Sequence, residues 1–231
     1  MTYDLICFDL DGTLVDTASE IAEAANRALQ SHGIARRPTA EITWLIGAGT
    51  RELMLNLLAR CLLEQPELAG RVQPDAVLQS MDEHYAITTG SQAVPYGGCH
   101  DALEALRAAG VKLACVTNKE LRHAHRVLKV TRLDDYFDLV IGGDSLPEKK
   151  PHRSVLRHVA QTLEVSLART AHLGDSITDV TAARNAGVAA WAVPYGYNAG
   201  QPIADAKPDL LFDHLLAVSQ HVLALRQGRG A

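Results

Sequence analysis

The chain has 231 residues, of which 47% are hydrophobic and 21% charged, and its formal net charge is −5. This length and composition are typical of a globular protein with one large domain, or with one domain and a smaller one. The sequence has no basic stripe with interleaved aromatic residues and no apolar stretch long enough to cross a bilayer. We therefore expect neither a nucleic-acid partner nor a membrane partner.

The N-terminus and the cysteines bear on the cellular compartment. An apolar strand is predicted to begin by residue 3, which leaves no room for a signal peptide. The four cysteines (Cys7, Cys61, Cys99 and Cys115) lie far apart, and none belongs to a Cys-x-x-Cys pair. We expect reduced thiols in a cytoplasmic protein rather than disulfides or a zinc site.

The first predicted element is an apolar strand over 5–10, which carries Asp9 and runs directly into Asp11, Gly12 and Thr13. Buried carboxylates are costly unless their charge is compensated. Mg²⁺ can compensate it because it prefers hard oxygen ligands, and a carboxylate held beside Mg²⁺ can attack a phosphoryl group. The alternative is a strand followed by an Asp-Gly turn, which explains Asp11 and Gly12 but not Asp9.

No convincing strand pattern occurs between residues 17 and 90. Three amphipathic helices are predicted there, over 17–32, 51–64 and 74–86. They indicate a helical module that is inserted between the first strand and the rest of the sheet. Its hinges are predicted at 14–16 and at 93–98, and the second hinge contains the Pro95, Gly97 and Gly98 expected of a boundary.

Strands and helices alternate from residue 99 onward, which favours a parallel sheet covered on both faces. Gly110 and Gly187 each follow a helical pattern and precede a strand, as C-terminal caps do. The strands are predicted at 112–117, 139–142, 171–174, 189–193 and 210–212, and the helices at 100–109, 121–130, 154–163, 178–186 and 214–225. The last residues, 227–231, are expected to fray.

Polar side chains occupy the carboxyl ends of these strands, where ligands of open parallel sheets bind. Thr117 and Asn118 end one strand, and Asp175 and Ser176 end another. Further on, Asp179 follows Asp175 by four residues, and Lys150 lies in a loop just before a helix. Any one of these residues has an ordinary structural explanation, and Lys149 competes with Lys150. Together with Asp9 and Asp11 they predict one site for phosphoryl transfer.

Each residue type has a task in that chemistry, where catalysis is mostly positioning and charge stabilisation. Asp9 is the candidate nucleophile, and Lys150 reduces its repulsion from the phosphate. Thr117, and the side chain or backbone amide of Asn118, can donate to phosphoryl oxygens. Asp11 can protonate the leaving oxygen and later deprotonate the attacking water.

The metal would draw its remaining protein ligand from Asp175. Asp179, one helical turn further on, is placed to hold a metal-bound water or to orient Lys150. Ser176, beside Asp175, is assigned with Asp179 to the layer that supports the metal ligands. Pro151 favours Lys150 over Lys149, because it fixes the chain just after Lys150 and opens the next helix.

The chain resembles the haloacid dehalogenase-like hydrolases over nearly its whole length. The motifs that carry the resemblance are 9–13 (DLDGT), Thr117, Lys150 with Pro151, and 174–179 (GDSITD). The resemblance implies an α/β fold: a Rossmann-like parallel sheet core (1–16 and 94–231) with an inserted small α-helical cap domain (17–93). It also implies that Asp9 is the nucleophile and Asp11 the acid/base.

In that family, Mg²⁺ would be held by the carboxylates of Asp9 and Asp175 and by the backbone carbonyl of Asp11. An acid two residues after the nucleophile marks phosphate chemistry, whereas the dehalogenases lack it. The resemblance therefore implies a hydrolase of small phosphorylated metabolites rather than of haloacids.

Further stretches are similar to bacterial phosphoglycolate phosphatases: 116–119 (VTNK), 141–144 (IGGD), 149–152 (KKPH) and 194–198 (PYGYN). The stretch 46–51 (IGAGTR) resembles their substrate-facing loop, which places Gly47 at the substrate and lets Arg51 reach its carboxylate. The alternative is a surface arginine at the start of a cap helix. The sequence departs from the family at Arg153 and at 96–98, where proline is common, and this concerns loop stiffness rather than chemistry.

We expect a Mg²⁺-dependent phosphatase that hydrolyses 2-phosphoglycolate through an aspartyl-phosphate. Alternatives within the superfamily are a sugar-phosphate mutase (β-phosphoglucomutase-like), a pyrophosphatase and a nucleotidase. A non-enzymatic alternative is a signalling receiver domain, but such domains are shorter and carry no inserted cap. The oligomeric state is left open.

Other residues are expected to be structural. Gly47 and Gly49 begin a dinucleotide fingerprint, but its third glycine is missing, so NAD is rejected. The histidines, including the pairs His123/His125 and His152/His158, are interpreted as surface residues. Trp44 is expected to pack within the cap, and Trp191 within the core.

Overall fold

The computed structural model of the protein describes residues 2–228. Its centre is a six-stranded sheet in the order β5-β4-β1-β6-β7-β8, in which all neighbouring strands are parallel. The strands are β1 (Leu5–Phe8), β4 (Lys112–Val116), β5 (Leu139–Ile141), β6 (Thr170–Gly174), β7 (Ala189–Ala192) and β8 (Leu210–Leu211). The strands β1, β4 and β6 lie side by side, so the carboxyl ends that carry the polar motifs meet at one edge.

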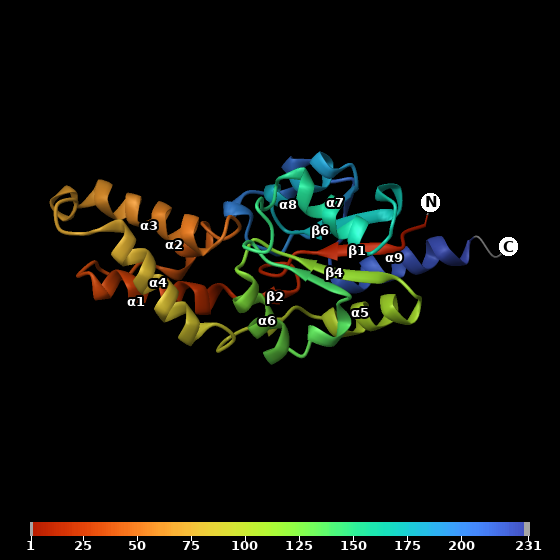
Figure 1. Cartoon of the computed structure of the whole chain (residues 1–231), viewed down its shortest axis with the longest axis horizontal. Coiled ribbons are helices and arrows are strands. Elements are labelled where there is room, and N and C mark those ends of the chain that lie inside the picture. Colours follow the sequence, from red (N-terminus) through yellow and green to blue (C-terminus); the bar gives the residue numbers. More distant parts are fainter. Residues whose placement is uncertain (1, 229–231) are drawn as a thin grey trace.

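Helices cover both faces of this sheet (Figure 1). One face packs against α5 (Cys99–Ala108), α6 (Leu121–Val130) and α9 (Leu215–Gln227), and the other against α7 (Arg153–Thr162) and α8 (Ile177–Ala186). Successive side chains of a strand point to opposite faces. Ile6 and Phe8 therefore join the first apolar cluster, whereas Leu5 and Cys7 join the second. Because both faces of the sheet are buried at β1, the sequence of this strand is a continuous apolar run.

A separate helical unit projects from one end of the sheet (Figure 1). It consists of α1 (Ala18–Ser31), α2 (Thr39–Thr43), α3 (Thr50–Glu64) and α4 (Pro74–Thr88), which share an apolar cluster distinct from the two sheet clusters. We call this unit the cap. Its own core supports the division into a cap over 17–93 and a core over 1–16 and 94–231, and these boundaries remain our proposal.

The two connections between cap and core pair with each other. β2 (Val15–Asp16) and β3 (Val94–Pro95) form a short antiparallel pair, in which Val15 lies opposite Pro95. These strands lie within the predicted hinges, but no strand was predicted there because two-residue strands have no detectable alternation. The pairing brings the exit and the return of the chain together beneath the cap.

The observed elements differ from the predicted ones mostly at their ends. β1 ends at Phe8 rather than at residue 10, because the chain turns after Asp9 and the backbone N–H groups of residues 13–15 bond to the carbonyl of Leu10. The short helix α2 was not predicted, and neither were five 3₁₀ turns: Pro66–Leu68, Asp134–Tyr136, Leu167–Arg169, Asn198–Gly200 and Ile203–Ala206. Of the tail expected to fray, Gln227 ends α9, and residues 229–231 lie outside the described residues.

Several general expectations can be compared with the described residues. Cys7, Cys61, Cys99 and Cys115 are all free and buried. Trp191 is buried in the core, as predicted. Across residues 2–228, no helix has both the length and the apolar character that crossing a membrane requires.

Candidate active site

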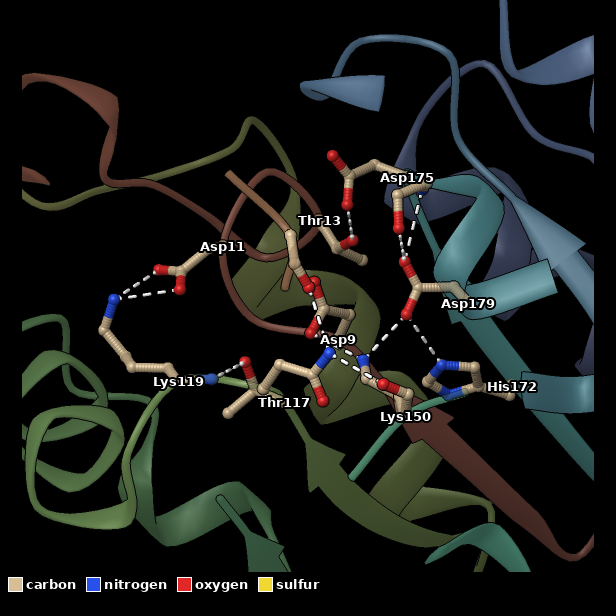
Figure 2. A network of polar contacts seen from close by, with 12 residues as sticks. Asp9, Asp11, Thr13, Thr117, Lys119, Lys150, His172, Asp175 and Asp179 are labelled. Atoms are coloured by element: carbon tan, nitrogen blue, oxygen red, sulfur yellow. Dashed lines mark hydrogen bonds and ion pairs between the residues drawn. The ribbon is translucent and has the colours of Figure 1, made fainter. Parts of the chain in front are cut away.

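Asp9 lies at the carboxyl end of the central strand β1. Its backbone N–H donates to the carbonyl of Leu173 at 2.9 Å, which fixes its position relative to β6. Its carboxylate is buried and accepts a hydrogen bond from Lys150 Nζ at 2.8 Å (Figure 2). Burial raises the pKa of Asp9 to about 6, although the charge of Lys150 opposes that shift. Asp9 is thus held in the position and environment of a reactive carboxylate.

Asp11 points away from Asp9 and toward Lys119, which was not predicted as a site residue (Figure 2). Lys119 Nζ donates to both carboxylate oxygens of Asp11, at 2.8 Å and 2.9 Å. Thr17 Oγ1, at the start of the cap, donates to Asp11 Oδ1 at 2.6 Å. The carboxylate of Asp11 therefore connects the core to the first residues of the cap.

Lys150 is held between two acids. Its Nζ donates to Asp179 Oδ1 at 2.7 Å as well as to Asp9. The same Asp179 oxygen lies 3.0 Å from His172 Nε2, and the other Asp179 oxygen accepts from the hydroxyl of Ser176 at 2.6 Å. Burial raises the pKa of Asp179, but Lys150 and His172 overcome that effect and hold the pKa well below its usual range.

Three of the predicted site residues therefore lie together: Lys150, Ser176 and Asp179. Asp179 and Ser176 form the capping box at the start of α8, so the same carboxylate both starts the helix and orients Lys150. Lys149, the competing lysine, lies elsewhere and pairs with Glu52 of the cap at 2.6 Å. The role of His172 is not predictable from the sequence, because His172 lies inside the apolar strand β6 without an acidic neighbour in the sequence.

Asp175 is buried at the carboxyl end of β6 and is held from two sides. Thr13 Oγ1 donates to its Oδ1 at 3.1 Å, and the backbone N–H of Tyr197 donates to its Oδ2 at 2.6 Å. Burial raises the pKa of Asp175 well above its ordinary value, and the nearby charges of Asp9 and Asp179 raise it further. These two donors were not predicted as part of the site, since one comes from the turn after Asp11 and the other from the 194–198 loop.

Thr117 and Asn118 follow β4, next to β1. Both side chains are buried, and both residues line the cavity above Asp9. The amide nitrogen of Asn118 donates to the carbonyls of Gly47 and Lys150, each at 3.0 Å. Asn118 therefore fixes the cap loop and the Lys150 loop relative to each other, which is a structural task that the sequence did not reveal.

A cavity lies between the cap and the carboxyl edge of the sheet. It has about 390 Å³ of space that protein atoms do not fill, its mouth included. Gly47 lines it, as expected of a residue in the substrate-facing loop, whereas Arg51 is exposed and does not line it. A polar contact joins the cap to the core beside this cavity, where Thr50 of the cap donates to Glu120 of the core at 2.5 Å.

The donor set at this edge suits a divalent cation. Carboxylate oxygens of Asp9, Asp175 and Asp179 lie within 4.8 Å of one another. Burial raises the pKa values of Asp9 and Asp175, and the charge of a neighbouring acid raises each of them further. Mg²⁺ prefers such oxygen ligands, so the residues fit the expected metal. The cluster contains Asp179 in addition to Asp9 and Asp175, whereas the carboxylate of Asp11 faces Lys119.

Two structural expectations from the sequence are wrong. His123 and His172 are buried rather than on the surface. His123 Nδ1 lies 3.0 Å from Thr89 Oγ1 and its ring packs on Tyr85, whereas His172 lies inside β6 beside Asp179. The burial of His123 was not predicted because it depends on contacts between its helix and the cap region, and only the tertiary structure shows those contacts. Trp44 is 52% exposed rather than packed within the cap, because it lies at the rim beside Gly200 of the core.

Comparisons with known proteins agree with this geometry. The family model of haloacid dehalogenase-like hydrolases matches residues 3–187. The phosphoglycolate phosphatase of Psychrobacter arcticus is 37% identical, over 96% of this chain and 97% of its own. A plasmid-encoded phosphoglycolate phosphatase of Cupriavidus necator is 39% identical over 92% of this chain and 90% of its own. A solved structure of a predicted phosphoglycolate phosphatase from Haemophilus somnus superimposes with a TM-score of 0.85 at 31% identity, covering 95% of this chain and 98% of that one.

Proposed function

We propose that the protein uses Asp9 as a nucleophile, requires Mg²⁺ and hydrolyses 2-phosphoglycolate. The premise is that the chain belongs to the haloacid dehalogenase-like hydrolase family and is a phosphoric monoester hydrolase, like its curated relatives. The observation that carries the proposal is the buried Asp9 carboxylate beside Lys150, at the floor of a cavity closed by the cap. Products would be glycolate and phosphate.

In the first half of the reaction, an oxygen of Asp9 attacks phosphorus as the bond from phosphorus to the ester oxygen breaks. The carboxyl group of Asp11 gives its proton to the departing oxygen, which leaves as an alcohol. Lys150 lies against Asp9 and offsets negative charge on the transferred group, and the hydroxyl of Thr117 can donate to a phosphoryl oxygen. The phosphoryl group is then bound to Asp9.

In the second half, a water molecule attacks phosphorus and the bond from phosphorus to Asp9 breaks. Asp11 takes the proton from that water, which returns both carboxyl groups to their starting states and releases phosphate. The cap contacts at Thr50 and Asn118 keep bulk water away from the site during transfer. The same pair of acids therefore serves both halves.

Mg²⁺ would be held by the carboxylates of Asp9 and Asp175 and the backbone carbonyl of Asp11, with Asp179 beside them. When bound, it supplies positive charge that reduces the repulsion between the phosphate dianion and Asp9. Asp175 is kept in place for this task by Thr13 and by the backbone of Tyr197.

The choice of substrate rests on two observations. The curated relatives that match this chain over nine-tenths of its length are named as phosphoglycolate phosphatases. The cavity between cap and core is small and partly apolar, which suits a short leaving group.

Phosphate release from a panel of esters tests the proposal. The panel contains 2-phosphoglycolate, β-glucose 1-phosphate, pyrophosphate and a nucleoside monophosphate, each with Mg²⁺ and with EDTA. We expect preference for 2-phosphoglycolate, loss of activity in EDTA and its return with excess Mg²⁺. Full turnover by an Asp9→Asn variant would overturn the nucleophile assignment, and preference for another ester would overturn only the substrate.

A further inference from the structure

The cavity above Asp9 has two different walls. Apolar side chains of the cap, Ile21, Ile46 and Leu53, form one wall, and the floor on the core side carries charged and polar groups. A carboxylate placed in such a cavity loses hydration, so it needs a charged or hydrogen-bonding partner there. A substrate with both a phosphate and a carboxylate therefore requires positive charge at two separate points.

Lys119 is the one positively charged side chain that lines this cavity within residues 2–228. Its side chain is 1% exposed, and its ammonium lies 5.1 Å from the centre of the Tyr85 ring. Figure 2 shows Lys119 and Asp11 on one side of Asp9, and Asp175 and Asp179 on the other. Lys150 is already used at the phosphate end by Asp9 and Asp179. Lys119 is thus the cation on the side of Asp9 opposite Asp175 and Asp179, where it is paired with Asp11.

We propose that Lys119 determines substrate specificity: its ammonium binds a carboxylate on the leaving group of the phosphoester. This inference rests on the function proposed above and adds the residue that recognises the substrate. An ammonium has three N–H donors, and the described hydrogen bonds of Lys119 Nζ go to the two oxygens of Asp11. It can therefore turn to a substrate carboxylate while it keeps a bond to Asp11.

Binding in this way also frees the acid/base. Both oxygens of Asp11 accept from Lys119, and Oδ1 accepts from Thr17 as well. A carboxyl group that transfers a proton to the leaving oxygen needs one oxygen without a competing donor. When the substrate carboxylate draws Lys119 away from one Asp11 oxygen, that oxygen becomes available on the side where the leaving group lies. A substrate without the carboxylate leaves Asp11 occupied.

Arg51 is the rival candidate for this role. It lies in the first turn of the cap helix α3, and it is exposed and does not line the cavity. Lys149 is excluded by its contacts, since its ammonium is held at the rim by Glu52 and by the carbonyl of Ala48. The roles of Lys119 and Arg51 can be distinguished by mutation, because Lys119 lies in the core and Arg51 lies in the cap.

The experiment compares two esters that differ only at the carboxylate: 2-phosphoglycolate and 2-hydroxyethyl phosphate. The kcat/KM ratio of the two is measured for the wild-type protein and for Lys119→Met, Lys119→Gln and Arg51→Met. We expect the wild-type protein to prefer 2-phosphoglycolate and each Lys119 variant to lower that ratio about 10- to 100-fold. Arg51→Met should keep the ratio within about threefold of wild type.

The outcomes separate the inference from the function on which it rests. A Lys119 variant that slows both esters equally would show a merely structural role and overturn the inference, as would loss of the preference in Arg51→Met. Equal turnover of both esters by the wild-type protein would overturn the inference alone. Turnover of neither ester, nor of the wider panel, would overturn the proposed function with it. Lys119→Gln keeps a donor for Asp11, so the ratio can be measured even if Lys119→Met does not fold.

Discussion

The ammonium of Lys150 lies 2.7 Å from Asp179 Oδ1, and both side chains are 2% exposed. This pair joins the loop before α7 to the first turn of α8. Because Lys150 also donates to Asp9, Asp179 sets the position of the only lysine that contacts the candidate nucleophile within residues 2–228. A residue of the helix α8 thereby controls the charge at the end of β1.

Asp179→Asn tests that relationship. Loss of one partner leaves the buried Lys150 charge incompletely paired and weakens the bond from His172, so we expect the free energy of unfolding to fall by about 3 kcal/mol. Turnover should fall by about 100-fold because Lys150 is no longer held against Asp9. Urea unfolding and steady-state kinetics measure the two effects. Unchanged stability together with unchanged turnover would contradict the role of Asp179.

The position of Asp175 depends on Gly196, in the loop that also donates the Tyr197 N–H. A Cβ atom at Gly196 would lie 2.2 Å from Cβ and Oδ2 of Asp175, too close to be accommodated without movement. We expect Gly196→Ala to shift Asp175, to raise the Mg²⁺ concentration needed for half-maximal activity and to lower turnover by about tenfold or more. A magnesium titration of the activity measures both changes.

Gly70→Ala is the matched control, since an added Cβ there meets nothing within 4 Å. It should leave the magnesium titration unchanged. If the two alanine variants behaved alike, the close approach of Gly196 to Asp175 would have no functional consequence.

The buried His123 predicts a pH dependence of stability. Burial lowers its pKa to about 4, and the charges of Arg122 and Lys119 act in the same direction. The folded state therefore favours the neutral ring: its contribution is complete above the unfolded pKa of about 6.5 and is lost as the pH falls toward 4, by at most about 1.4 kcal/mol per pH unit.

Comparison of the wild-type protein with His123→Gln isolates this contribution from the titration of the acids. The difference in unfolding free energy between the two proteins should shrink between pH 6.5 and pH 4. A difference that stayed constant over this range would mean that His123 keeps the same proton affinity in the folded and unfolded states.

The sequence alone predicted the parts of the fold that depend on local pattern. The order of strands and helices in the core follows from apolar runs separated by amphipathic stretches, and the helical insertion follows from the lack of strand pattern over 17–90. The short pair β2 and β3 was missed because two residues carry no periodicity. The exact end of β1 was missed because the turn after Asp9 is made by backbone bonds rather than by special residue types.

The residues of the candidate site also include some that local sequence pattern predicts and some that it does not. Asp9, Thr117, Lys150, Asp175 and Asp179 were found because each follows a strand or opens a helix at the edge where ligands bind. Lys119 and His172 were missed because their tasks depend on partners far away in the sequence: Asp11 lies 108 residues from Lys119. The partners of such side chains can be identified only from the tertiary structure, in which the topology brings the strands together.

The most direct test of the central claim is to trap the phosphoryl group on Asp9. The protein is mixed with 2-phosphoglycolate and Mg²⁺, quenched during turnover and treated with borohydride, which reduces an aspartyl-phosphate to homoserine. Peptide mass spectrometry then identifies the residue at position 9, and the Asp9→Asn variant is the control. We expect homoserine at position 9 only when substrate is present. Rapid phosphate release with unmodified Asp9, together with activity in Asp9→Asn, would contradict it.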